Sequence, residues 1–133
     1  MKTLTKWKHD GVFESQQEGS LVPITIDTDR KVGPGPKSLL LSGLSGCTGI
    51  DVVDILKKMR VEFSDFSIEA EAEQTEEHPK VFKDIFVVYT IKTDPANEDK
   101  VKKAIELSID KYCGVSAMLK KNSTIHYKLQ LLE

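Results

Sequence analysis

The chain has 133 residues, of which 39% are hydrophobic and 30% are charged, a composition typical of a single globular domain. Nineteen lysines and arginines stand against 21 aspartates and glutamates, and the formal net charge of −2 is not the basic excess that nucleic-acid-binding proteins usually carry. We therefore expect one domain over residues 1–133 and no nucleic-acid partner.

The N-terminal segment 1–10 contains no apolar core of the kind that a signal peptide needs. No window of the chain approaches the ~18 consecutive apolar residues that favour a membrane span. We therefore expect no membrane partner and a cytoplasmic location. In a reducing compartment, two cysteines are more often catalytic, redox-sensing or inert than permanently cross-linked.

The first third of the chain predicts short strands at 3–9, 11–15 and 21–27, followed by a rigid turn at 31–36. Pro36 suits the first turn of a helix, which the apolar run extends to about Met59. This helix is apolar on nearly all sides, which is typical of a helix buried on most sides. Its glycines at 43, 46 and 49 each cost about 1 kcal/mol relative to alanine, so we expect another backbone to approach this stripe.

The remaining chain predicts two strands, at 66–73 and 81–92, of which the first alternates apolar and glutamate or serine residues. Asp94 and Pro95 then begin a helix that runs to about Tyr112 and is broken by Gly114. A short helix at 115–121 and a final strand at 123–131 complete the order βββ-α-ββ-αα-β. This order predicts an α+β fold in which six strands form one sheet over the central helix. We therefore expect a second helix or a second subunit to cover the other side.

The thiols of the two cysteines, Cys47 and Cys113, are the most reactive side chains in the sequence. Cys47 lies within the long helix, with mainly apolar neighbours at three and four residues, and an apolar shell raises the pKa of a thiol. Asp51 acts in the same direction if it points at the sulfur, so Cys47 is a nucleophile only if a cation faces it. The alternative is a buried, inert cysteine that behaves as a small hydrophobe.

Cys113 follows the second helix and lies far from Cys47 in the chain, unlike the close pairs of thioredoxin-type or zinc-ribbon motifs. Any contact between the two thiols must be made by the fold. The three histidines (His9, His78, His126) show no ligand spacing with either cysteine, so we expect no metal and no other cofactor. His126 is expected to be exposed, and His78 lies in an acidic loop.

Four segments of the sequence resemble the OsmC/Ohr family of osmotically inducible and organic hydroperoxide resistance proteins. They are GPKSLL (35–40), CTGIDVV (47–53), EHPKVF (77–82) and YCGVS (112–116). The resemblance covers most of the chain from about Gly33 onward and is closest to the OsmC-like branch. It implies an OsmC-like fold: an intertwined homodimer of α+β subunits, with antiparallel sheets wrapped around a long central helix from each chain.

The resemblance also implies a thiol peroxidase. Cys47 would attack an organic hydroperoxide and become a sulfenic acid, and Cys113 would condense with it to a disulfide. A dithiol, lipoyl or thioredoxin-like, would then reduce that disulfide. In the family an arginine, oriented by a glutamate, stabilises the thiolate, and Arg30 is our candidate for that arginine.

Lys37 occupies the position of the family's glutamate and cannot orient an arginine. Either Lys37 supplies the cation itself, or the pairing around the thiolate differs. This departure favours an alternative function as a non-peroxidase redox sensor or small-molecule-binding protein on the same scaffold. A third alternative is that both thiols are inert core residues.

Overall fold

The computed structural model describes residues 1–133, and the chain forms two compact units, Met1–Leu40 and Leu41–Glu133, which are described in turn. The first unit contains β1 (Thr3–His9), β2 (Val12–Gln17) and β3 (Ile24–Asp27), which pair antiparallel in that order. All three strands were predicted. After β3 the chain turns tightly, and a Cβ at Gly33 would overlap the carbonyl of Thr25, which explains the glycine at that position.

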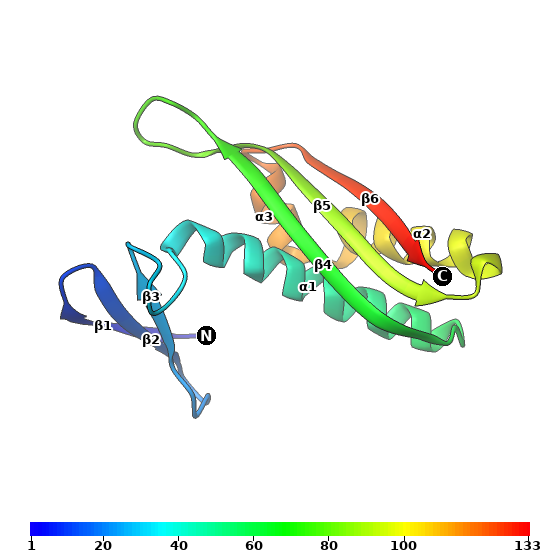
Figure 1. Cartoon of the computed structure of the whole chain (residues 1–133), viewed down its shortest axis with the longest axis horizontal. Helices are drawn as coiled ribbons and strands as arrows, with labels where there is room; N and C mark the ends of the chain where they lie inside the picture. Colours follow the sequence, from blue (N-terminus) through cyan, green and yellow to red (C-terminus); the bar gives the residue numbers. More distant parts are fainter. The chain divides into compact units, whose positions relative to one another are not determined.

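The second unit contains most of α1 and a sheet with three further helical segments (Figure 1). The elements are α1 (Pro36–Lys58), β4 (Phe63–Gln74), β5 (Phe82–Thr93), the 3₁₀ turn η1 (Pro95–Asn97), α2 (Glu98–Leu107), the π-helical turn η2 (Ser108–Tyr112), α3 (Gly114–Lys120) and β6 (Ile125–Leu132). This order agrees with the predicted one, and α1 begins at Pro36 as expected.

The strands form two separate three-stranded sheets, and not the single six-stranded sheet that we expected. In the second unit β4 and β5 are antiparallel, whereas β5 and β6 are parallel, so the prediction of antiparallel sheets is wrong for that pair. The parallel pairing follows from the connection, because η1, α2, η2 and α3 carry the chain back before β6 begins.

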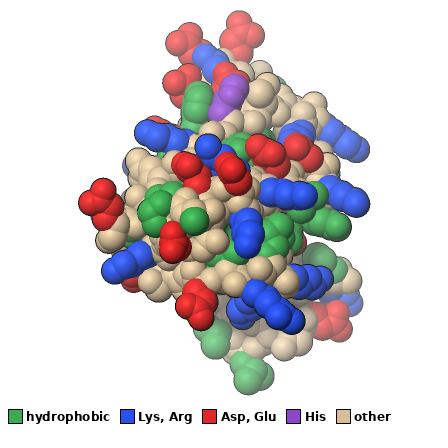
Figure 2. All heavy atoms as spheres, turned by 90° about the vertical axis from the view of Figure 1, so that its right-hand side faces the viewer, with side chains coloured by type: hydrophobic (Ala, Val, Ile, Leu, Met, Phe, Trp, Pro, Cys, Tyr) green, Lys and Arg blue, Asp and Glu red, His purple; other side chains and the backbone are tan.

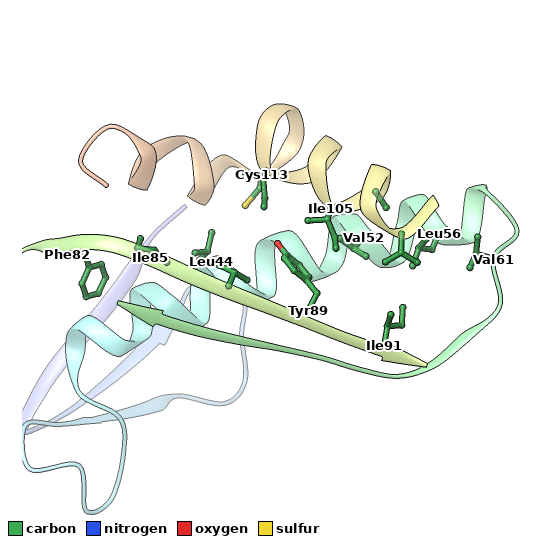
Figure 3. Packing of buried hydrophobic residues seen from close by; sticks show 14 residues of the cluster. Leu44, Val52, Leu56, Val61, Phe82, Ile85, Tyr89, Ile91, Ile105 and Cys113 are labelled. Carbon is green, nitrogen blue, oxygen red and sulfur yellow. The ribbon is translucent and has the colours of Figure 1, made fainter. Parts of the chain in front are cut away.

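The helices cover one face of this sheet, and the core lies between the two layers (Figures 1 and 3). Alternate residues of β6 face the core, as the pattern of Ile125, Tyr127, Leu129 and Leu131 predicted. The β5 side chains Ile85, Tyr89 and Ile91 are fully buried against the helices. Burial of such side chains supplies the main favourable free energy of folding.

Only one face of α1 is buried within its own chain. Leu44, Thr48, Val52 and Leu56 recur every four residues and face the core, whereas Ile50 is 65% exposed. The prediction of a helix buried on most sides is therefore wrong for the single chain. An apolar groove lies on this uncovered side, between α1 and β4; it is lined mainly by Ser45, Gly46, Gly49, Ile50, Val53, Phe66 and Ile68.

By length and composition α1 would also suffice to cross a membrane, although no span was predicted. This is a weak indication, because the core helix of a soluble protein passes the same test. The side chains that α1 buries against β5 and α2 are those of a core helix.

The predicted cap of the second helical segment is confirmed, because Oδ1 of Asp94 accepts the N–H of Ala96 at 2.9 Å. The predicted break at Gly114 is shifted by one residue. Cys113 has extended backbone angles, and Gly114 is the first residue of α3. The interruption thus falls on the cysteine itself.

Acidic and basic side chains are mixed over the face of the molecule shown in Figure 2. Neither sign dominates that face, in keeping with the near-neutral charge of the whole chain. Such a surface gives little long-range attraction for a polyanion.

Candidate redox site

Cys47 lies in the middle of α1 and is partly exposed. It is close to the residues that the helix buries, since Leu44 is three residues before it and Thr48 follows it. Its side chain packs at the edge of the hydrophobic core. The thiol therefore borders the interior of the protein and keeps a route to solvent.

Cys113 is nearly fully buried, with 3% of its surface exposed. It is the N-cap residue of α3, and its sulfur accepts the N–H of Ser116 at 3.3 Å. Burial raises the pKa of the Cys113 thiol to about 11, and the neighbouring Cys47 acts in the same direction. Two cysteines that are far apart in the sequence therefore lie close enough in the fold for one to affect the ionisation of the other.

The difference in exposure gives the two thiols different chemical access. Cys47 is partly exposed, whereas Cys113 has almost no exposed surface. The raised pKa keeps Cys113 protonated near neutral pH. Of the two, Cys47 is thus better placed to meet an external oxidant first, and Cys113 to meet an oxidised Cys47.

A chain of buried hydroxyl groups lies beside the cysteines. The hydroxyls of Thr48 and Tyr89 are 2.8 Å apart, and Oγ of Ser108 is 2.8 Å from Oγ1 of Thr48. Ser108 also donates to Oδ2 of Asp51 at 2.9 Å. Burial raises the pKa of Tyr89 to about 12, so this phenol remains a hydrogen-bond donor at neutral pH.

Asp51 is the charged group that this network places near the thiols. Burial is the main cause of the raised pKa values of Cys113 and Tyr89, and the negative charge of Asp51 makes a smaller contribution in the same direction. The sequence analysis expected Asp51 to disfavour a thiolate at Cys47 if it pointed at that sulfur. The structure instead directs its carboxylate to Ser108, and its effect appears at Cys113.

The cation that the site would need was assigned to Arg30 or Lys37. Arg30 lies in the turn after β3, with a left-handed backbone (φ 59°), and belongs to the unit Met1–Leu40. Lys37 lies in the first turn of α1, in the same unit. The cysteines belong to the other unit, so the roles of Arg30 and Lys37 stay predictions.

The histidines are outside this cluster of thiols and hydroxyls. His126 is exposed, as predicted, stacks on Phe86 and lies 3.0 Å from Asp84. His78 precedes Pro79 in the loop between β4 and β5. No three His, Cys, Asp or Glu side chains are grouped as a metal site would need.

Sequence reasoning missed the hydroxyl network. Thr48 follows Cys47 directly, but Ser108 and Tyr89 carried no signal of their own, because a serine in a helix and a tyrosine in an apolar strand are ordinary core residues. The available signal was a polar residue on an otherwise apolar helix face: Thr48 lies on the same face as Leu44 and Val52. A buried hydroxyl needs a partner, and that requirement points to further polar residues nearby.

Comparisons with known proteins agree with this fold and with the sequence motifs. The family model described as OsmC-like protein matches residues 27–128. Protein YhfA of Escherichia coli K12 is 27% identical over 132 residues, covering 99% of this chain and 98% of YhfA. A hypothetical protein from Aquifex aeolicus VF5 has a crystal structure that is 31% identical, with a TM-score of 0.83 and coverage of 99% and 97%.

The fold is also that of a protein named for hydroperoxide resistance. The organic hydroperoxide resistance protein OhrB of Bacillus subtilis is 18% identical, with a TM-score of 0.64, and the match covers 98% of this chain and 96% of OhrB. At this identity the likeness shows the fold alone. Together with the family match over most of the chain, these findings establish that the protein belongs to the OsmC-like family, within the OsmC/Ohr fold group.

Proposed function

We propose that this protein is a cysteine-based peroxidase that reduces organic hydroperoxides, with Cys47 as the nucleophile and Cys113 as the resolving thiol. The observation that carries the proposal is the proximity of a partly exposed and a buried cysteine that are far apart in the sequence. Family membership and the name of OhrB support the choice of organic hydroperoxide as the substrate class.

The first step would oxidise Cys47. Its thiolate attacks the terminal oxygen of the hydroperoxide, the S–O bond forms and the O–O bond breaks, and two electrons pass from sulfur to the peroxide. The organic alkoxide leaves and takes up a proton to become the alcohol. The partial exposure of Cys47 supports this role, since the peroxide must reach the sulfur. Arg30 remains our candidate for the cation that stabilises the thiolate.

The second step would join the two cysteines. The Cys113 sulfur attacks the sulfenic sulfur of Cys47, the hydroxyl group leaves, and the Cys113 proton completes a molecule of water. Burial of Cys113 supports this role, because a sulfur out of solvent is more readily reached by Cys47 than by free peroxide. A lipoyl or thioredoxin-like dithiol of the cytoplasm would then reduce the disulfide by thiol–disulfide exchange.

The functional unit would be a homodimer. Within one chain, a Cβ added at Gly43 or Gly46 meets no other atom within 4 Å, and Ile50 is largely exposed. The apolar groove, which Gly46 lines, and the open Gly43 one turn before it on α1 suit the close approach of a second copy of α1. The expected approach of another backbone to the glycine stripe is therefore assigned to the partner subunit.

Stopped-flow mixing of the fully reduced protein with cumene hydroperoxide tests the proposal. We expect loss of the Cys47 thiol within seconds, followed by a Cys47–Cys113 disulfide identified by mass spectrometry. Cys47→Ser serves as the control that retains Cys113. Persistence of the Cys47 thiol for many minutes under excess hydroperoxide would overturn the peroxidase proposal.

One observation favours the second candidate, a redox sensor or small-molecule-binding protein. The Asp51 carboxylate lies near the thiols, and its negative charge opposes ionisation of Cys113. A slow, stoichiometric oxidation without turnover would suit a sensor better than an enzyme. Native mass spectrometry after incubation with cell extract distinguishes the binding alternative, which requires a retained ligand and no peroxide consumption.

A further inference from the structure

Ser108 connects the two segments that carry the cysteines. Its hydroxyl lies 2.8 Å from Oγ1 of Thr48 and 2.9 Å from Oδ2 of Asp51, both on α1. Thr48 follows Cys47 directly, and Asp51 lies one helical turn beyond it. The carbonyl of Ser108 accepts the N–H of Cys113 at 2.7 Å. A single residue thus contacts the helix of one thiol and the backbone of the other.

The protons of this network can be counted. The Ser108 hydroxyl is oriented to donate to both Oγ1 of Thr48 and Oδ2 of Asp51, so these two acceptors on α1 share its one proton. Thr48 and Tyr89 form a further hydrogen bond, in which either hydroxyl can be the donor. Because Ser108 and Thr48 are fully buried, water cannot replace a lost partner without rearrangement.

The backbone around Ser108 is also unusual. Residues Ser108–Tyr112 form a π-helical turn, in which the N–H of Cys113 reaches back five residues to the Ser108 carbonyl. Such wide turns occur mostly as single insertions in α-helices and often at functional sites. The turn ends at Cys113, whose extended backbone begins α3. The position of the Cys113 sulfur is therefore set by where Ser108 is held.

We propose that Ser108 is a positioning residue, which holds Cys113 at the distance from Cys47 that disulfide formation requires through its contacts with Thr48 and Asp51. We call these three residues the Ser108 latch. This inference rests on the proposed function for its biological meaning, but the latch can be tested without peroxide. It acts on the second step, in which the two sulfurs join, and not on the supply of oxidant.

Disulfide formation in glutathione buffers measures the latch directly. In this exchange, Cys47 and Cys113 lose two electrons and two protons, and oxidised glutathione gains them to become two molecules of reduced glutathione. The protein is equilibrated across a series of glutathione ratios, quenched with acid, alkylated and weighed by mass spectrometry. We expect Ser108→Ala to lower the effective concentration of the two thiols on the order of tenfold, as the loss of a buried hydrogen-bonded group predicts.

Two matched substitutions separate positioning from general loss of stability. Ser123→Ala also removes a nearly buried hydroxyl, one that donates to the Phe82 carbonyl at 3.0 Å, but it lies outside the latch. We expect its disulfide equilibrium to equal that of the wild type. If Ser108→Ala fails to fold, Thr48→Val and Thr48→Ser carry the test. Valine removes the hydroxyl at nearly constant volume and must weaken the disulfide, whereas serine keeps the hydroxyl and must restore it.

The peroxide experiment gives a second readout. In Ser108→Ala and Thr48→Val, the sulfenic acid of Cys47 should persist longer before the disulfide appears, and Thr48→Ser should shorten that interval again. Equal disulfide equilibria in wild type, Ser108→Ala and Thr48→Val would overturn the latch. Formation of the disulfide from glutathione, without reaction of the wild type with hydroperoxide, would instead overturn the proposed function and leave the latch standing.

Discussion

The sulfur of Cys113 accepts the backbone N–H of Ser116 at 3.3 Å and so caps α3. Helix N-caps are usually serine, threonine, aspartate or asparagine, whose oxygens accept such bonds better than a sulfur does. As a cap alone, cysteine is a poor choice at this position. The proximity of Cys47 and the proposed role of Cys113 as the resolving thiol would give a chemical reason for its presence.

Replacement of Cys113 by serine should separate the two steps of the proposed reaction. Serine can accept the Ser116 N–H and keep α3 capped, so the fold should be retained. With no resolving thiol, we expect one equivalent of hydroperoxide to be consumed and sulfenic acid to accumulate at Cys47. Trapping with dimedone and mass spectrometry measures this product. Continued turnover with a dithiol as reductant would show that Cys113 is not the resolving residue.

Replacement of Cys47 by serine should abolish hydroperoxide consumption. Cys113 alone is buried and has a raised pKa, so it offers neither access nor a thiolate near neutral pH. The activity is measured as consumption of cumene hydroperoxide, with the residual peroxide determined by an iodide assay. If the Cys47→Ser protein retained more than a few per cent of the wild-type rate, Cys47 would not be the nucleophile.

Ionisation of the Cys113 thiol should destabilise the folded protein in alkaline solution. Its pKa is raised from 9.0 to about 11 in the folded state, so between these values the folded chain holds a proton that the unfolded chain has released. This contribution is complete below pH 9, and the free energy of unfolding falls as the pH rises through 11. Urea unfolding of the reduced protein at a series of pH values measures the slope.

The Cys113→Ser protein is the control for this alkaline loss, because it lacks the titrating thiol. Its free energy of unfolding should fall less steeply between pH 9 and 11. Tyr89, whose pKa is raised from 10.0 to about 12, adds its own decline between those two values in both proteins. Identical slopes for the two proteins would contradict the raised pKa of Cys113.

Protonation of the Asp27 carboxylate in acid should destabilise the turn after β3. This carboxylate accepts the N–H groups of Val32, Asp29 and Lys31 at 2.9 to 3.1 Å, which lowers its pKa below 3.8. Its stabilising effect is therefore present above pH 3.8 and is lost as the pH falls through the lowered value. We expect Asp27→Asn to lower the melting temperature at pH 7 and to have less effect in strong acid.

Asp29→Asn is the matched control, since Asp29 is exposed and offers its backbone N–H, not its side chain, to the Asp27 carboxylate. Differential scanning calorimetry of both variants at pH 7 and near pH 2 compares them. Equal melting temperatures of the Asp27→Asn and Asp29→Asn proteins at pH 7 would argue against a structural role for the Asp27 carboxylate.

A leucine at Gly46 should disrupt the proposed dimer. A Cβ added at Gly46 has open space around it within its own chain, so we expect the single subunit to tolerate the larger residue and a partner to be obstructed by it. Overpacking an interface costs about 1–3 kcal/mol, which weakens association on the order of tenfold or more. Sedimentation velocity over a concentration series measures the change, with Lys103→Leu on the exposed face of α2 as the control.

Helix starts, caps and strand faces were predicted well, because each depends on residues that are close together in the sequence. Pro36 begins α1, Asp94 caps the turn that leads into α2, and Phe66, Ile68, Ala70 and Ala72 face the same side of β4. These features depend on backbone angles, capping and periodicity within a few residues. They can therefore be read from a single sequence.

Other features depend on residues that meet only in the folded chain. Cys47 lies near Cys113 in the fold, but their pairing as nucleophile and resolving thiol stays a prediction, and the links from Thr48 to Ser108 and Tyr89 were not foreseen. The parallel pairing of β5 with β6 was also missed, because strand direction depends on the path of the helices between them. Nothing in the local pattern of either strand encodes that path.

The π-helical turn at Ser108–Tyr112 contains one residue more than an ordinary helical turn would use. Removal of one residue from this turn would restore regular α-helical hydrogen bonding and rotate everything that follows by about 100°. Cys113 would then face away from α1 even though its sequence and its neighbours were unchanged. The number of residues in this turn, and not only their identity, thus fixes the side of the helix on which Cys113 lies.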